Sequence, residues 1–338
     1  MMWIVDDWAT RLISVWLQGT LAIGAALLLV RVKRLPVALR VWALRLALLK
    51  LHLSAIFVGG FGLAVSPQAE ANRVLGGPFQ QALQICLIAA FSLWAISVVT
   101  GLLRFWRENG KLLDLVREAM PAADEGAKQL YRELCRRMSI RQAPRLLEHP
   151  SMLSPVLIGC RRPAIVLPSS LLLAGDSAGL RSVLAHELAH YRHGDLRWSW
   201  LSALADALFF FHPLTRPAIR KLRLQEELAA DAAAIGATGA RPSDYSRTLI
   251  SFAHATLMAT GVCAMADGAK DLDQRIRAVH EGPPKIGKLH RALLLSALLV
   301  ATSTLIPWTL HSDDPAKPAT SLPPGVYAPV GVAARALP

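Results

Sequence analysis

Long apolar stretches alternate with charged segments along this chain. Four of them approach the roughly 20 apolar residues that a helix needs to cross a bilayer. They cover residues 12–30, 46–65, 82–103 and 292–310. The first, third and fourth contain no Asp, Glu, Lys or Arg. We therefore predict four transmembrane helices, three of them before residue 104.

The run over residues 46–65 is the weakest of the four because it includes Lys50 and His52. Lys50 lies near the start of the run, where a long side chain can carry its ammonium group to the membrane surface. Composition supports a membrane protein. The chain is 53% apolar and 18% charged, with a mean hydropathy of +0.37, which is too apolar for an ordinary soluble protein.

Lys and Arg gather at three junctions: after the first apolar run, after the third, and before the fourth. Basic junctions face the cytoplasm. We therefore expect a multi-pass protein of a bacterial-type inner membrane, with both termini outside and residues 104–291 in the cytoplasm. Residues 311–338 form a short, Pro-rich external tail. The net charge of +13 follows from this topology, and no nucleic-acid-binding motif is present, so no nucleic-acid partner is expected.

Residues 104–291 predict a mostly helical domain with a small sheet. Short β-like segments at 144–150, 154–159 and 164–168 lie between helical patterns, and turn residues separate the last two as in a hairpin. The apolar run over 198–211 is short for a span, which favours a buried helix over a partly membrane-embedded one. Asp195 is expected to be the N-cap of that helix.

The strongest chemical signal is the sequence His186-Glu187-Leu188-Ala189-His190. It fits H-E-x-x-H, in which two histidines one helical turn apart bind one zinc ion. Glu187 points beside the ion, where a base for the attacking water belongs. With ten histidines and ten glutamates in the chain, about 0.01 such matches are expected by chance.

A catalytic zinc ion needs a third protein ligand, with the fourth position left for water. Glu226 and Glu227 are both candidates in a later helical segment, where the neighbours are mainly Ala and Leu. Asp231 lies one turn after Glu227 and could orient a ligating histidine. His193 and Asp195 are weaker candidates, for tautomer control or helix capping.

These motifs together resemble the regulatory membrane metallopeptidases of the BlaR/MecR type. The resemblance covers about residues 10–310. It rests on the early spans and the last span, and on the segments SPVLIGCRRPAIVLP, HELAHYRHGDL, FFFHPL, EELAAD and DQRIRAV. Two positions depart from the family pattern: Ala230 stands where Cys is usual, and His212 where Asn is common. Neither is an implied ligand.

The resemblance implies an inserted, mostly α (α+β) gluzincin-like zinc peptidase domain in a multi-pass α-helical membrane protein. It implies one Zn²⁺ per chain, bound by His186, His190 and Glu227, with Asp231 supporting a ligand and Glu187 as the catalytic base. Antibiotic-sensing members carry a penicillin-binding domain after the last span. Residues 311–338 are too short for an independent core, so we do not expect this chain to capture a β-lactam.

The leading hypothesis is a regulated zinc endopeptidase that cleaves a protein or peptide substrate, either a transcriptional repressor or the chain itself. One alternative is a housekeeping membrane protease of the HtpX or prenyl-protease type, which shares H-E-x-x-H and the Glu-x-x-x-Asp pair. Another is a non-catalytic membrane signal transducer. The strand Ala164–Leu167 could pair with an extended substrate or serve structure alone. The sequence is also compatible with a homo-oligomer.

Overall fold

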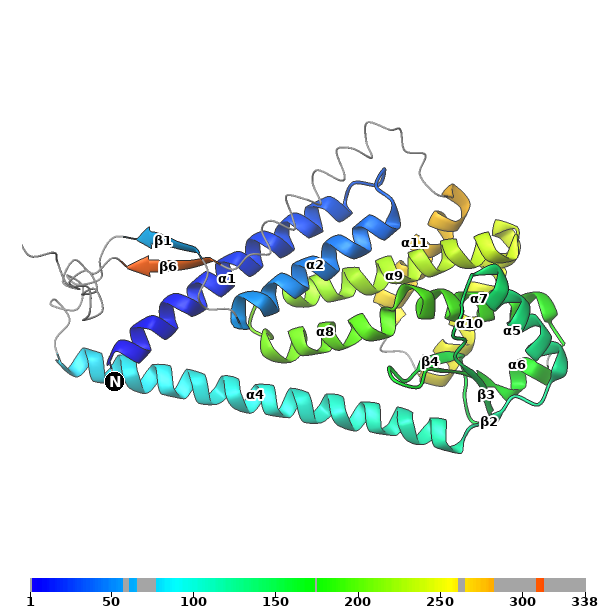
Figure 1. Ribbon diagram of the computed structural model, residues 1–338, viewed down its shortest axis with the longest axis horizontal. Coiled ribbons are helices and arrows are strands. Elements are labelled where there is room, and N and C mark those ends of the chain that lie inside the picture. Colours follow the sequence, from blue (N-terminus) through cyan, green and yellow to red (C-terminus); the bar gives the residue numbers. More distant parts are fainter. Residues whose placement is uncertain are drawn as a thin grey trace, which may run out of the picture.

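The computed structural model describes residues 2–56, 61–65, 77–173, 175–260, 265–282 and 308–312. Helices dominate, and a small sheet lies at one end of the molecule (Figure 1). The helices are α1 (Met2–Val30), α2 (Val37–Ile56), α4 (Gly77–Glu118), α5 (Glu125–Arg137), α6 (Ser169–Leu173), α7 (Ser177–His193), α8 (Asp195–Leu208), α9 (Thr215–Thr238), α10 (Pro242–Thr260) and α11 (Met265–Glu281). The strands are β1 (Phe61–Val65), β2 (Met120–Pro121), β3 (Arg145–His149), β4 (Val156–Ile158), β5 (Ala164–Pro168) and β6 (Trp308–Ser312). The prediction of a mostly helical protein with a small sheet is confirmed.

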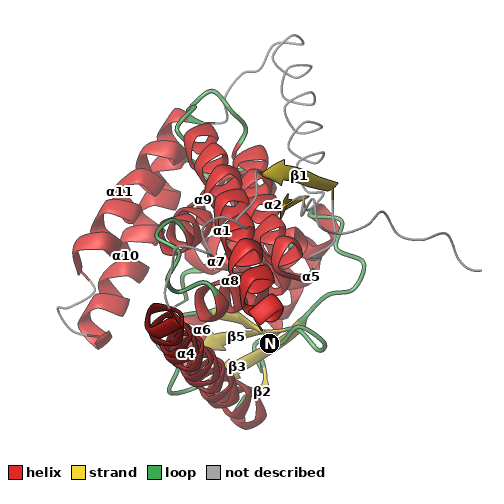
Figure 2. Ribbon diagram, turned by 90° about the vertical axis from the view of Figure 1, so that its left-hand side faces the viewer, coloured by secondary structure: helices red, strands yellow, loops and turns green. Residues whose placement is uncertain are grey.

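The main sheet has the order β2-β3-β5-β4. Figure 2 shows β2, β3 and β5 side by side. β4 and β5 form the expected antiparallel hairpin, while β3 pairs with β5 in parallel. Every residue of β5 is buried, as expected for a central strand. This placement contradicts the prediction that β5 could pair with an extended substrate, because its backbone is already paired on both sides. The two end strands of this sheet are β2 and β4.

Two apolar cores meet at α9. One core joins α5, α7 and β5 to the C-terminal half of α9, through residues such as Leu134, Ile165 and Leu184. The other joins α1, α2 and α8 to its N-terminal half, through Ile23, Leu48 and Leu222. Because α9 belongs to both cores, α1 and α2 are packed as one structure with α5 and α7. α9 is thereby fixed against α7 along the segment that carries the candidate ligands.

The predicted span over residues 46–65 is not one helix in the structure. α2 begins at Val37 and ends at Ile56, and residues 61–65 form β1, which pairs in parallel with β6. Lys50 does not extend to a membrane surface: it is only 2% exposed within the protein. The reason is that α1, α8 and α9 pack against α2, so Arg45 and Lys50 are buried inside the protein.

The predicted run over 82–103 lies inside α4, which continues to Glu118. Within the part of the chain that the structure describes, the segment Ile88–Glu118 is the one helix long and apolar enough to cross a membrane. α1 contributes a shorter apolar segment, Val15–Val30. The multi-pass topology therefore stays a prediction. Most of the fourth predicted span and the predicted tail lie outside the described residues.

α8 follows α7 without a linker, because Gly194 ends one helix and precedes the next. Its φ of 72° is the left-handed conformation that favours glycine at a helix C-terminus. The predicted N-cap role of Asp195 is wrong: Asp195 is the first residue of α8, and its carboxylate turns toward α7 and α2. α8 is buried on one face only, since Ser202 and Ala205 are buried while Trp200 and Leu204 are exposed.

Candidate metal centre

The three predicted ligands converge between α7 and α9. The two histidine Nε2 atoms lie 3.1 Å apart. Glu227 Oε2 lies 3.4 Å from His186 Nε2, and Glu227 Oε1 lies 3.6 Å from His190 Nε2. His186 and His190 share a face of α7 because they are one helical turn apart. The packing of α9 on α7 brings Glu227 to the same point.

The spacing of these atoms fits a tetrahedral zinc ion. Ligands about 2.1 Å from zinc in a tetrahedron are separated from one another by roughly 3.4 Å. The three measured separations, 3.1, 3.4 and 3.6 Å, bracket that value. Two imidazoles and one carboxylate also form a donor set typical of a catalytic zinc site, which keeps one position open. The residues present therefore fit the metal that the sequence predicts.

His186 is backed by a polar network from three helices. Its Nδ1 lies 3.1 Å from Asp231 Oδ1 and 3.3 Å from the hydroxyl oxygen of Tyr245. Arg275 donates to both oxygens of Asp231 at 2.8 Å and also contacts Glu227 Oε2 at 2.9 Å. An Nδ1–H that donates to Asp231 leaves the Nε2 lone pair free for a metal. Arg275 thus orients the candidate ligand Glu227 and also Asp231, the residue that supports the ligand His186.

His190 has an equivalent support on the opposite side. Its Nδ1 lies 2.6 Å from Asp195 Oδ2. Asp195 Oδ1 accepts a hydrogen bond from the guanidinium of Arg45, which comes from α2. The same guanidinium donates to Glu226 Oε1 at 2.7 Å and to the backbone oxygen of His193 at 3.2 Å. Glu226, the other candidate ligand, therefore faces Arg45 and not the metal position.

The pKa values of these groups are shifted in the directions that favour a positive charge at the site. Burial lowers the pKa of His186, but hydrogen bonds to Asp231 and Glu227 outweigh it and raise the pKa to about 10. Burial raises the pKa of Glu227, but His186 and Arg275 outweigh it and bring the pKa to about 2. The pKa of Asp231 is likewise held below its usual value, by Arg275 and His186 against burial. Glu227 is therefore a carboxylate at every physiological pH.

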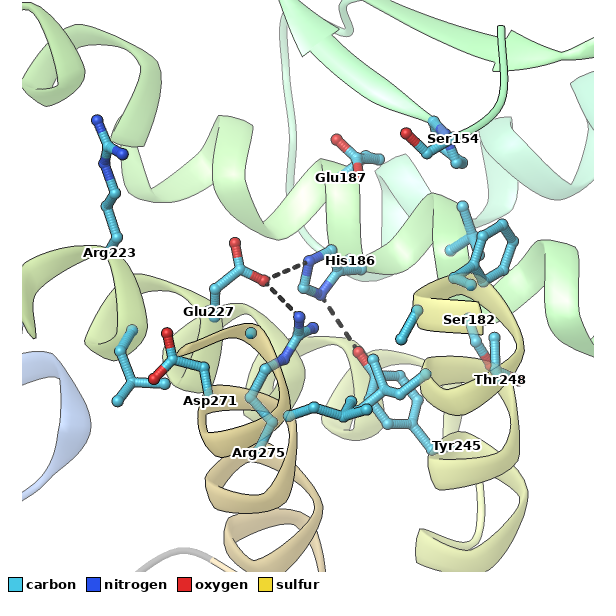
Figure 3. A pocket seen from close by; sticks show the side chains of 18 of the residues that line it. Ser154, Ser182, His186, Glu187, Arg223, Glu227, Tyr245, Thr248, Asp271 and Arg275 are labelled. Carbon is cyan, nitrogen blue, oxygen red and sulfur yellow. Dashed lines mark hydrogen bonds and ion pairs between the residues drawn. The ribbon is translucent and has the colours of Figure 1, made fainter. Parts of the chain in front are cut away.

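A cavity of about 550 Å³ opens beside the ligands and is lined by His186, Glu187 and Glu227. Figure 3 shows Glu187 near Ser154, on the side of His186 away from Arg275. Ser154 and Pro155, which precede β4, form part of the wall, and α10 and α11 supply apolar side chains such as Phe252 and Leu272. Glu187 is thus next to the candidate ligands without being one of them, and it borders this cavity.

Sequence reasoning missed three residues of the site. Arg45, Tyr245 and Arg275 lie on α2, α10 and α11, far in sequence from the motif, and periodicity gives no sign of their role. A buried arginine in an apolar run and the segment DQRIRAV were the available signals. Tyr191, which follows His190, donates to the backbone oxygen of Gln142 at 2.6 Å, so its hydroxyl has a structural partner.

Two comparisons relate the sequence of this chain to known proteins. The family model described as BlaR1 peptidase M56 matches residues 66–279. The chain is also 24% identical over 148 residues to the regulatory protein BlaR1 of Bacillus licheniformis, a match that covers 44% of this chain and 24% of that protein. The chain thus spans about a quarter of the length of that relative. The family model covers more than half of the chain and includes all the candidate ligands. The protein therefore belongs to the BlaR1 peptidase M56 family.

Proposed function

We propose that this protein is a membrane-embedded, zinc-dependent endopeptidase with a regulatory role. The observation that carries the proposal is the triangle of His186, His190 and Glu227, whose ligand atoms all lie within 4.8 Å of one another beside an open cavity. Membership of a peptidase family supports hydrolysis of peptide bonds. The charge pattern of the sequence supports a cytoplasmic site.

The chain's own residues divide the chemistry among them. A zinc ion held by the triangle would supply a water of lowered pKa and polarise the substrate carbonyl. Glu187 accepts the proton of the attacking water and passes it to the leaving nitrogen. Asp231 and Asp195 hold the two imidazoles in the tautomer that presents Nε2. Arg275 pairs with Asp231, and Arg45 pairs with Asp195, so each buried acid has a cation beside it.

β4 is the strand that suits an extended substrate. It is the end strand of the sheet, and the residues that precede it line the cavity. A peptide that adds to this edge would receive main-chain hydrogen bonds and would place a peptide bond near Glu187. The substrate proposed is a protein with an extended segment, either a transcriptional repressor or a part of this chain.

The test compares the full-length wild type with Glu187→Gln, both purified in detergent, and uses Glu281→Gln as an exposed control. We expect one zinc ion per chain in all three proteins, because Glu187 is not a ligand. Proteolysis should fall by roughly 10²-fold or more in Glu187→Gln alone, since a positioned base contributes about that much. Proteomic comparison of cells with the wild type and this variant should show the substrate. Absence of bound zinc, or unchanged cleavage by Glu187→Gln, would disprove the proposal.

A further inference from the structure

A second cavity, of about 600 Å³, lies between α4 and the pair α8 and α9. Four arginines line it: Arg104 from α4, and Arg216, Arg220 and Arg223 from α9. The three on α9 share one face, since they are spaced by four and three residues. Glu108 and Asp206 are the acids in the lining, so four positive charges against two negative charges leave a formal excess of two.

Within the part of the chain that the structure describes, internal ion pairs do not bury these arginines. Arg216 contacts Asp206 at 3.0 Å, and this pair is exposed. All four guanidinium-bearing residues are exposed, so water and ligands can reach them. Direct contacts between α4 and the end of α8 fix the two helices on either side of this cavity. Trp94 of α4 donates to the backbone oxygen of Leu208 at 2.9 Å, and Gly101 packs closely against Ala207.

This arginine-lined cavity, called the basic groove below, lies where the apolar part of α4 ends. Before Arg104, α4 has no charged residue from Gly77 onward, and large apolar side chains on it are exposed. These are Ile85, Ile88, Phe91, Leu93, Ile96, Val99 and Leu103. Trp106 is 68% exposed at the same level, and Trp200 packs edge-on against Phe105 with ring centroids 4.7 Å apart. Exposed tryptophans at this depth are typical of a membrane–water boundary.

From these observations we infer that the groove binds the phosphate of an anionic phospholipid, whose acyl chains lie along the exposed apolar face of α4. Arginine is well suited to phosphate because its planar guanidinium donates two parallel hydrogen bonds. Basic pockets between helices on the cytoplasmic side of a membrane are suited to such headgroups. A free phosphate would satisfy the arginines, but it would leave the adjoining apolar face uncovered. The inference rests on the proposed membrane position of α4 and not on catalysis.

The test measures lipid binding to the full-length protein in neutral detergent by native mass spectrometry. The probes are phosphatidylglycerol, phosphatidylcholine and inorganic phosphate. The groove variant is Arg104→Gln with Arg220→Gln. Its matched control is Arg132→Gln with Arg247→Gln, two exposed arginines on α5 and α10 that change the net charge equally. None of these four residues contacts the metal ligands.

We expect phosphatidylglycerol to bind the wild type and the control equally, and the groove variant more weakly by roughly tenfold or more, because two charge-assisted contacts are lost. Phosphatidylcholine should bind more weakly than phosphatidylglycerol to every protein. Equal binding of phosphatidylglycerol by the groove variant and the control would overturn the inference. So would binding of inorganic phosphate at the groove with no preference for phosphatidylglycerol over phosphatidylcholine. Zinc content and proteolysis do not enter these readouts, so a failure of the proposed activity is recognised separately.

Discussion

The guanidinium of Arg45 binds the carboxylate of Asp195, and the other oxygen of that carboxylate contacts Nδ1 of His190. A metal ligand on α7 is therefore connected through one side chain to α2, a helix outside the motif. Arg45 is 1% exposed, so this connection is shielded from water. Any shift of α2 relative to α7 would change the support of His190. The N-terminal helices thus have a direct structural route to the metal centre.

Replacement of Arg45 tests this connection. Arg45→Met would leave the buried side chain of Asp195 without its cation and Glu226 without its hydrogen-bond donor, which costs about 3 kcal/mol of folding stability. Loss of support for His190 should weaken zinc binding by about 10- to 100-fold. Arg45→Lys keeps the charge and should lose less on both measures. Thermal unfolding and competition with a chelator measure the two effects, and wild-type zinc affinity in Arg45→Met would contradict the prediction.

On the His186 side of the site, replacement of Arg275 should cost more folding stability than replacement of Tyr245. Arg275→Met removes the cation that contacts both Asp231 and Glu227, and the expected loss of stability is about 3 kcal/mol or more. Tyr245→Phe removes one hydrogen bond to Asp231, which keeps both contacts with Arg275, so the loss should be about 1 kcal/mol. Both variants can be compared by thermal unfolding in the same detergent. A larger effect of Tyr245→Phe would show that the hydroxyl, and not the cation, holds Asp231.

The local part of the site could be predicted, because a helix fixes it. The positions of His186 and His190 on one face follow from their spacing alone, and Glu187 follows from its place between them. The choice of Glu227 over Glu226 needed the family resemblance. Both lie on one helix, and only the packing of α9 between α7 and α2 turns one toward the metal position and the other toward Arg45.

Tertiary packing explains the errors. Lys50 could have reached a membrane surface because it lies near the start of an apolar run, but an apolar helix can also be covered by other helices, as α2 is. For Ala164–Leu167 the sequence left open pairing with a substrate or a structural role alone, because a strand's neighbours depend on the sheet order, and the structure places it between two other strands. Asp195 has the residue type of an N-cap, but Gly194 takes that position and the carboxylate supports His190 instead.

Zinc affinity should rise with pH over the range from 6 to 9. The folded-state pKa of His186 is raised to about 10, so its imidazole must release a proton before Nε2 can bind zinc. One such proton changes the apparent affinity by about tenfold per pH unit. Glu227, with a pKa of about 2, releases no proton in this range. Chelator competition at several pH values measures the slope, and a flat profile would show that the histidines do not compete with protons.

Gly194 lies between α7 and α8 and directly precedes Asp195, the first residue of α8. Its φ of 72° costs any residue with a Cβ about 1–2 kcal/mol, although an added Cβ would meet no atom within 4 Å. Gly194→Ala should therefore destabilise the protein by about 1 kcal/mol through backbone strain. If the strain is relieved by a shift of α8, Asp195 moves away from His190 and zinc binds more weakly. Gly194→Asn is the matched control, because Asn tolerates this conformation better. Thermal unfolding and zinc competition on both variants separate strain from displacement. Equal losses of zinc affinity in Gly194→Ala and Gly194→Asn would mean that the conformation of residue 194 does not position Asp195.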